Sequence, residues 1–253
     1  MKNQNKSAQI IERIHKFNPQ SLDEFRNVLS SKRKISKFIL TEEKLLGLLD
    51  IIEADYKILE ISNKRLLPYH NLYFDSDKKN LYLDHHNRKE KRFKVRIRKY
   101  LETQDCYLEI KKKKGAKLEK VRLGVDDITD KLDTKSIRFI KNETNSDLDF
   151  QPVLFNDFHR ITLMNNSKNE RVTIDTDISF NNKESDVSLN GLVIIEIKQN
   201  QFNRNSSIMK SLKKMYINPI KISKYCIGVV CLFPDIKYNR FKIKLSKINN
   251  LIN

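Results

Sequence analysis

The sequence predicts an α+β fold built around an antiparallel sheet, and three observations point to it. Strand-type segments with alternating apolar and polar residues run through most of the 253 residues and are separated by turn-type loops. The few helical patterns do not alternate with strands as parallel βαβ units require. None of the five glycines has the spacing of a P-loop or of a dinucleotide-binding loop.

The periodicity of the apolar residues sets the expected elements. Apolar residues at helical spacing predict helices over residues 10–29, 41–54, 127–142 and 206–216. Alternation predicts strands over 33–40, 58–61, 69–74, 120–125, 153–164, 171–178 and 192–199, and a hairpin of two strands over 92–113. Ser21 and Thr41 stand where helix N-caps are expected.

The hairpin and several later strands carry apolar residues on one face and charges on the other. In chain order the charged faces hold Lys94, Arg96, Arg98, Glu109, Lys111, Lys113, Lys120, Arg122, Arg171, Glu196 and Lys198. One interpretation is the solvated outer face of a sheet. The other is a barrel whose charged faces point inward around a polyanion. Like charges on neighbouring strands repel, and this favours the second interpretation when several strands share the pattern.

Composition restricts the partner and the compartment. Lys and Arg number 50 against 32 Asp and Glu, so the net charge of +18 favours an anionic partner: phosphate, nucleic acid or an acidic membrane surface. Three cysteines without a CxxC pair fit a reduced cytoplasmic setting. The most apolar stretch, residues 225–233, is far shorter than the roughly 20 residues of a membrane helix. We therefore expect a soluble cytoplasmic protein.

Two carboxylates lie inside the basic pattern at the same local spacing. Glu109-Ile-Lys111 and Glu196-Ile-Lys198 each place an acid two residues before a lysine on one strand face. The acid can pair with that lysine or hold a divalent metal. Phosphoryl transfer uses metal ions to bridge phosphate oxygens and Arg or Lys to absorb the charge that develops.

Five segments in a fixed order carry a resemblance to a known family. KVRIRKY, LEIKKK, RVTIDTDI, VIIEIK and PIKISKY resemble the VTC-type polyphosphate polymerase domain, a branch of the triphosphate tunnel metalloenzymes. The resemblance spans about Arg33 to Cys231. It implies a closed antiparallel barrel of about eight strands with flanking helices. It also implies a tunnel that binds ATP, polyphosphate and Mn²⁺ or Mg²⁺, and transfer of the γ-phosphoryl group of ATP onto the polyphosphate chain with release of ADP.

The resemblance also implies site residues. The expected catalytic residues are Arg96, Arg98, Lys111 and Lys198. The expected substrate-binding residues are Lys37, Arg96, Arg98, Lys111, Lys113, Arg122, Arg160, Arg171, Lys221, Ser223 and Lys224. Glu196 matches the metal carboxylate of the family, and Glu109 is expected either to bind metal or to pair with Lys111. Asp175 shares a face with Arg171 and is expected to pair with a cation of the tunnel.

One departure separates this chain from the wider superfamily, and it bears on the alternatives. Ile35 stands two residues before Lys37, where the ExExK pattern of the superfamily has an acid, and this favours the polymerase branch. The alternatives are a tunnel-type hydrolase of triphosphate, nucleotide or RNA 5′-triphosphate, and a nucleic-acid-binding module. Aromatic residues do not interleave with the basic faces, so no nucleic acid is expected. The His85-His86 pair is expected on a solvated loop.

The chain is expected to divide into three parts. Residues 1–30 form an N-terminal helical segment, 31–235 the tunnel domain and 236–253 a polar C-terminal tail. No membrane span is expected, so coupling to a membrane protein would need another chain. The sequence predicts no oligomeric state.

Overall fold

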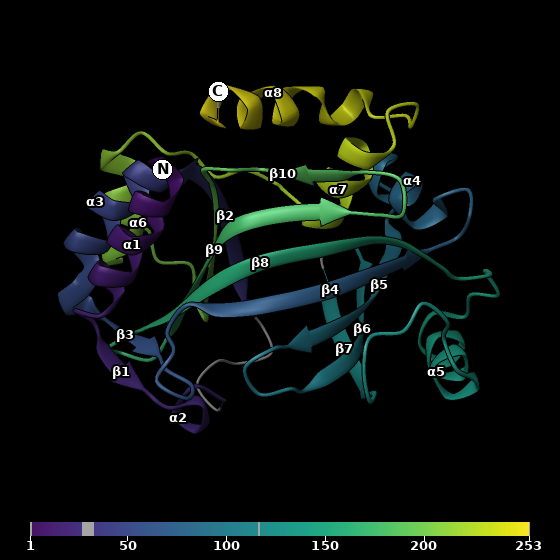
Figure 1. Ribbon diagram of the computed structural model, residues 1–253, viewed down its shortest axis with the longest axis horizontal. Helices are drawn as coiled ribbons and strands as arrows, with labels where there is room; N and C mark the ends of the chain where they lie inside the picture. Colours follow the sequence, from purple (N-terminus) through teal and green to yellow (C-terminus); the bar gives the residue numbers. More distant parts are fainter. Residues whose placement is uncertain (1, 27–32, 116, 253) are drawn as a thin grey trace.

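The computed structural model describes residues 2–26, 33–115 and 117–252, and its centre is one curled sheet (Figure 1). Eight strands follow one another in the hydrogen-bonded order β2-β11-β9-β8-β4-β5-β6-β7, each pair antiparallel. In that order they are β2 (Lys34–Thr41), β11 (Leu192–Gln199), β9 (Glu170–Asn181), β8 (Gln151–Asn165), β4 (Leu67–Asp75), β5 (Lys91–Tyr100), β6 (Cys106–Lys114) and β7 (Lys117–Gly124). Three short strands join its rim: β1 (Asn18–Gln20), β3 (Tyr56–Leu59) and β10 (Asp186–Ser188).

The predicted α+β class, the antiparallel sheet and the count of about eight strands are confirmed, but the predicted closure is wrong. The sheet path begins at β2 and ends at β7, and these two strands do not pair with each other in the described part of the chain. The sheet is therefore a half-barrel, curled around an inner face. The hydrophobic alternation of the strands could not reveal this, because closure depends on strand tilt and stagger.

Helices cover the apolar outer face of one half of the sheet. These are α1 (Lys2–Ile14), α3 (Glu42–Ile52, with η1 at Glu53–Asp55) and α6 (Ser207–Lys214). Val193, Ile195 and Ile197 of β11 are buried against this helical layer. Thr41 caps α3 as predicted, since its hydroxyl accepts the amide of Lys44 at 3.3 Å. The alternate residues of β11, Glu196 among them, therefore point to the inner face.

The other half of the sheet has its own apolar layer. Val95 and Ile97 of β5 and Leu108 and Ile110 of β6 are buried in a cluster that includes Ile140 of α5 (Thr134–Thr144). The neighbouring residues of these strands carry the charges. The sheet thus turns its apolar faces outward to helices and its charged faces inward, the second of the two interpretations of the sequence.

Helix α7 (Lys224–Leu232) packs on the inner side of the sheet. Tyr225 and Val229 of α7 share a buried cluster with Phe158 of β8 and Tyr73 of β4, and Tyr225 stacks on Tyr73. The sequence of α7 is apolar all round, which is typical of a buried helix. Its first residue, Lys224, is thereby placed next to the inner-face charges.

Several element predictions differ from the structure. The expected 10–29 helix is α1, strand β1 and α2 (Leu22–Arg26), while Val28 and Leu29 lie outside the described residues. The expected 127–142 helix begins only at Thr134, which follows the N-cap Asp133. Helices α4 (Asn80–His86), α7 and α8 (Lys242–Ile252, after η2 at Asn239–Phe241) were not predicted.

The prediction of a solvated loop for His85 and His86 is wrong, and the polar C-terminal segment contains helix α8. Ile248 of α8 is buried on the apolar cluster of α7. His86 ends α4 and is only 1% exposed, with its ring against Phe241 and its Nε2 accepting the amide of Arg240 at 3.4 Å. None of the described helices is long and apolar enough to cross a membrane.

Candidate anion-binding site on the inner face

The registers of β5, β6 and β7 put like charges directly opposite one another on the inner face. Lys94 lies opposite Lys111, and Lys111 lies opposite Lys120. Like charges in directly opposed positions destabilise a sheet. This row of three lysines is therefore an arrangement that an anion would stabilise.

Glu109 is a buried counterion for two of the cations. Its carboxylate accepts hydrogen bonds from Nε and Nη2 of Arg96 at 2.9 and 2.6 Å, and Lys120 contacts its other oxygen. Burial alone would raise the pKa of Glu109, but Arg96 and the neighbouring cations hold it well below its usual range. Glu109 is thus ionised, and its partners are Arg96 and Lys120 rather than the predicted Lys111.

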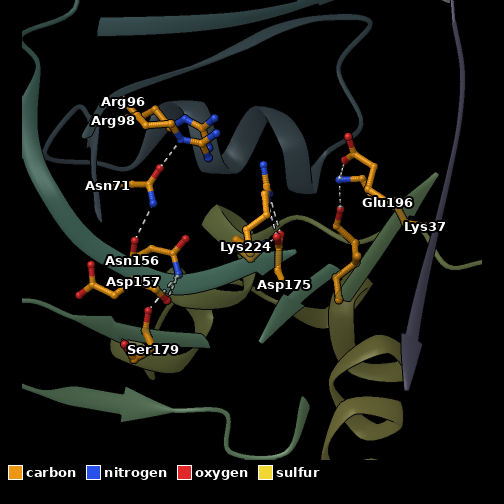
Figure 2. A network of polar contacts seen from close by, with 12 residues as sticks. Lys37, Asn71, Arg96, Arg98, Asn156, Asp157, Asp175, Ser179, Glu196 and Lys224 are labelled. Atoms are coloured by element: carbon orange, nitrogen blue, oxygen red, sulfur yellow. Dashed lines mark hydrogen bonds and ion pairs between the residues drawn. The ribbon is translucent and has the colours of Figure 1, made fainter. Parts of the chain in front are cut away.

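Asp175 on β9 is a second buried counterion for two cations. Its two oxygens accept from Nε and Nη2 of Arg160 at 2.5 and 2.8 Å, and Lys224 at the start of α7 contacts the same carboxylate (Figure 2). Burial opposes ionisation, yet these two cations keep the pKa of Asp175 below its usual range. The predicted pairing of Asp175 with an inner-face cation is confirmed. Burial lowers the pKa of Lys224 to about 8.

Glu196 is the third inner-face carboxylate, and it is more open than the other two. Its side chain is 17% exposed, against 2% for Glu109 and 4% for Asp175. Lys198 and Lys37 lie 2.9 and 3.0 Å from its oxygens. Burial opposes the shift, but the two lysines hold the pKa of Glu196 well below its usual value, so the group is ionised at neutral pH.

Lys111 and Lys94 have no carboxylate bound to them among the described residues. The pKa of Lys111 is lowered to about 7, mainly by desolvation; Glu196 opposes this shift, and the charges of Lys37 and Lys198 add to it. Burial also lowers the pKa of Lys94 to about 8. Lys111 stands on β6 and Lys37 on β2, near opposite ends of the sheet path, so their interaction shows that the curl brings the two ends to one site.

Arg98 is the most enclosed of these cations, with 6% of its surface exposed. Its Nε donates to Oδ1 of Asn71 at 2.7 Å, and the rings of Tyr69, Tyr100 and Phe158 lie 5.2–5.9 Å from the guanidinium carbon. In Figure 2, Lys224 lies in the middle, with Arg96 and Arg98 on one side of it and the pair of Lys37 and Glu196 on its other side. Cations from strands far apart in the sequence thus converge on one region.

The remaining predicted residues lie toward the edges of this cluster. Arg122 is exposed and packs over the ring of Tyr107, 4.6 Å from its centroid. Arg171 donates to the backbone carbonyl of Phe25. Ser223 is the N-cap of α7, accepting the amide of Cys226 at 3.4 Å. Lys113 is half-buried opposite Arg92, and Lys221 is exposed. Their predicted role in binding substrate stays a prediction.

The two predicted metal ligands differ in fitness for a metal ion. Mg²⁺ and Mn²⁺ take hard oxygen ligands, and Mg²⁺ is held by one or two carboxylates together with phosphate oxygens and water. Both carboxylates are bound by two cations, but Glu109 does not fit, because it is only 2% exposed, against 17% for Glu196. Glu196 fits as a single, ionised and partly exposed carboxylate. The described residues include no group of three or more His, Cys, Asp or Glu side chains that could hold a metal by themselves.

Four residues of the cluster were not among the predicted site residues. Lys94 and Lys120 were on charged faces but not among the expected site residues. Tyr73 accepts from Nη1 of Arg96 at 3.0 Å, and Asn71 accepts from Arg98. The signal for Asn71 was its place between Tyr69 and Tyr73 on one strand face, where an amide between two aromatics indicates a buried polar contact.

The curled antiparallel sheet and the cations on its inner face define a tunnel-fold domain. The VTC domain model matches residues 32–233. This match covers most of the chain, so the chain belongs to the VTC domain family. The resemblance predicted from the five sequence segments is confirmed.

Of two similar solved structures, one supports the fold, and it supports the fold alone. A protein of Bacillus halodurans, named a "putative adenylate cyclase", has a TM-score of 0.51 and 11% sequence identity, and the match covers 76% of this chain and 95% of that chain. A protein of Pyrococcus horikoshii has a TM-score of 0.44 and 12% identity over 77% of this chain and 99% of that one. A comparison with curated proteins finds no match.

Proposed function

We propose that this domain is a polyphosphate polymerase, which transfers the γ-phosphoryl group of ATP to the end of an inorganic polyphosphate chain and releases ADP. One observation carries the proposal. Lys94, Lys111 and Arg98 converge on the inner face, and no carboxylate of the described residues is bound to them, while Glu109 and Asp175 are already engaged as counterions. A ligand with closely spaced negative charges, such as a phosphate chain, complements these free cations.

The proposed reaction needs positioning and charge stabilisation more than acid–base chemistry. A terminal oxygen of the polyphosphate chain attacks the γ-phosphorus of ATP, and the bond from that phosphorus to the β-phosphate bridging oxygen breaks, so that ADP leaves with the electron pair. The attacking phosphate is already ionised, so no general base has to remove a proton. Arg98 and Lys111 would hold the γ-phosphoryl oxygens and absorb the charge that develops on them.

Glu196 would hold the divalent metal, Mn²⁺ or Mg²⁺, together with phosphate oxygens of the substrate. Bound there, the ion supplies Lewis-acid charge to the phosphate oxygens. Lys37 and Lys198, which now neutralise Glu196, would be free to turn toward the phosphates. This rearrangement of ion pairs is local, because all three side chains are on the neighbouring strands β2 and β11.

Transfer to phosphate is favoured over hydrolysis by the composition of the site. A hydrolytic tunnel site uses more than one open carboxylate, whereas here Glu196 is the only one of the three carboxylates described above that remains partly exposed. Ile35, which is 36% exposed on the strand of Lys37, occupies the position where the wider superfamily has an acid. A tunnel-type triphosphatase is the second candidate, and the product distinguishes it.

A nucleic-acid-binding role is disfavoured by the burial of the inner-face rings. Tyr69, Tyr73 and Phe158 do stand among the cations, but only 8%, 5% and 3% of their surfaces are exposed. Bases stack on aromatic rings that are open to solvent. These rings instead pack against the guanidinium groups and α7.

The test is to incubate the chain with ATP and Mn²⁺ or Mg²⁺ and to separate the products on a gel. We expect a ladder of phosphate chains together with ADP. Lys111→Ala should abolish the ladder, whereas Lys135→Ala, which removes an exposed lysine of α5, should not. Orthophosphate as the only phosphate product, across both metals and in the presence of a polyphosphate primer, would support the triphosphatase instead.

A further inference from the structure

We propose that Asn71 is a positioning residue that aims the guanidinium of Arg98 at the bound phosphate while leaving its positive charge unneutralised. This inference rests on the proposed function and deepens it, because it identifies which inner-face arginine is built to capture the anion. Asn71 itself does not contact the substrate and affects its binding only through Arg98.

The three inner-face arginines Arg96, Arg98 and Arg160 are held in two different ways. Arg96 and Arg160 each bind a buried carboxylate through Nε and Nη2. The fork of each is therefore occupied and its charge compensated. Arg98 has no ion pair with a carboxylate among the described residues, and its Nε donates to the neutral amide of Asn71.

The contact with Asn71 uses only one of the three guanidinium nitrogens of Arg98. Nε of Arg98 donates to Oδ1 of Asn71, and this leaves both terminal nitrogens, Nη1 and Nη2, for a bidentate grip on phosphate oxygens. A carboxylate at position 71 would also accept from Nε, but it would neutralise the positive charge of Arg98. The amide oxygen of Asn71 orients the guanidinium and leaves its charge available to an anion.

Asn71 is itself held so that only its oxygen can face Arg98. It is 0% exposed, and its Nδ2 donates to the backbone carbonyl of Asn156 at 2.7 Å. The side chain of Asn156 in turn donates to the backbone carbonyl of Ser179 at 2.9 Å. This chain of contacts joins β4, β8 and β9 (Figure 2), so the orientation of Asn71 is set by the sheet.

No carboxylate of the described residues forms a hydrogen bond or ion pair with Arg98, although the charge of Glu109 acts on Arg98 without direct contact. The rings of Tyr69, Tyr100 and Phe158 lie around the guanidinium and attract a cation through their faces. A buried cation whose direct contacts are all neutral is costly in the free protein. Binding an anion relieves that cost, which makes Arg98 a strong capture point.

The experiment measures equilibrium binding of tripolyphosphate by calorimetry in a double-mutant cycle of Asn71→Asp and Arg98→Ala. Asn71→Asp keeps the shape of the side chain and adds a charge beside Arg98, so we expect affinity to fall by about 10- to 100-fold. In the Arg98→Ala background the same change should cost far less, because the residue through which it acts is gone. Asn249→Asp, at an exposed position of α8, is the matched control for charge and should bind as the wild type does.

Asn71→Ser runs the same cycle without adding a charge, so a folding failure of Asn71→Asp leaves the test intact. Loss of affinity that shrinks in the Arg98→Ala background supports the proposal. An equal loss in both backgrounds, or no loss with either Asn71 variant, overturns it. The measurement requires no turnover, so a chain that binds tripolyphosphate but makes no polyphosphate would contradict the proposed function and leave this inference standing.

Discussion

Replacing Glu109 by Gln tests whether this residue is a structural counterion or a metal ligand. The carboxylate is 2% exposed and binds Arg96 through two nitrogens and Lys120 through a third contact. Gln has nearly the same shape but no charge and a single acceptor oxygen. The change therefore leaves the largely buried Arg96 and the partly exposed Lys120 without their counterion.

The expected cost follows from those contacts. Removing one partner of a buried ion pair costs about 3–5 kcal/mol, because the remaining charge stays buried and uncompensated. In a protein of this size, each kcal/mol shifts the melting temperature by roughly 2–4 °C. We therefore expect Glu109→Gln to lower the melting temperature by roughly 10 °C. Glu119→Gln on β7, whose carboxylate is 48% exposed and 3.6 Å from Lys112, should lower it by about 2 °C or less.

Thermal unfolding with and without tripolyphosphate separates the two roles. A bound polyanion supplies the missing negative charge near Arg96 and Lys120, so the gap between Glu109→Gln and the wild type should narrow at saturating ligand. A melting temperature of Glu109→Gln equal to that of the wild type would refute the counterion role. So would an unchanged melting temperature together with an activity that no longer depends on the metal.

Three further predictions concern the metal, the lysines and α7. Glu196→Gln should abolish polymer synthesis while polyphosphate binding, measured by calorimetry, persists; retained synthesis would refute its role as the metal carboxylate. The pKa values of Lys111 and Lys94 in the free protein are about 7 and about 8, and the anion binds the protonated lysines. The affinity for tripolyphosphate should therefore be highest below pH 7 and should fall as the pH rises through these two pKa values. An affinity that stays constant from about pH 6.5 to about 9.5 would contradict this. Gly228→Ala should lower the free energy of unfolding by about 1–3 kcal/mol, measured with denaturant, since a Cβ there would lie 2.6 Å from the ring of Phe180. Unchanged stability would contradict this, because it would mean that the Phe180 ring moves aside at no cost.

The strands and the direction of their charged faces could be predicted because alternation is a local property. Leu192–Gln199 was expected to the residue, with Glu196 and Lys198 on one face and Val193, Ile195 and Ile197 on the other, and β11 has these bounds. Some site residues could be expected only through the resemblance, since no local pattern distinguishes Arg160 from any other strand arginine.

The pairings within the site could not be predicted, because they depend on strand register and on curl. Glu109 was expected beside Lys111, its neighbour along the strand, but the contacts that hold it cross to Arg96 on β5 and Lys120 on β7. Helices α4 and α8 could not be predicted, because α4 is too short and α8 too polar to show a clear apolar periodicity. The burial of His86 depends on Phe241, which is distant in sequence.

The central claim is that the inner-face cations direct the γ-phosphoryl group to a phosphate chain rather than to water. It is tested most directly by supplying ATP labelled at the γ-phosphate together with a polyphosphate primer and a divalent metal, and by following where the label goes. The account predicts label at the chain terminus and one ADP for each phosphate added, with both lost in Arg98→Ala. Label recovered only as orthophosphate, or still as ATP, would contradict it.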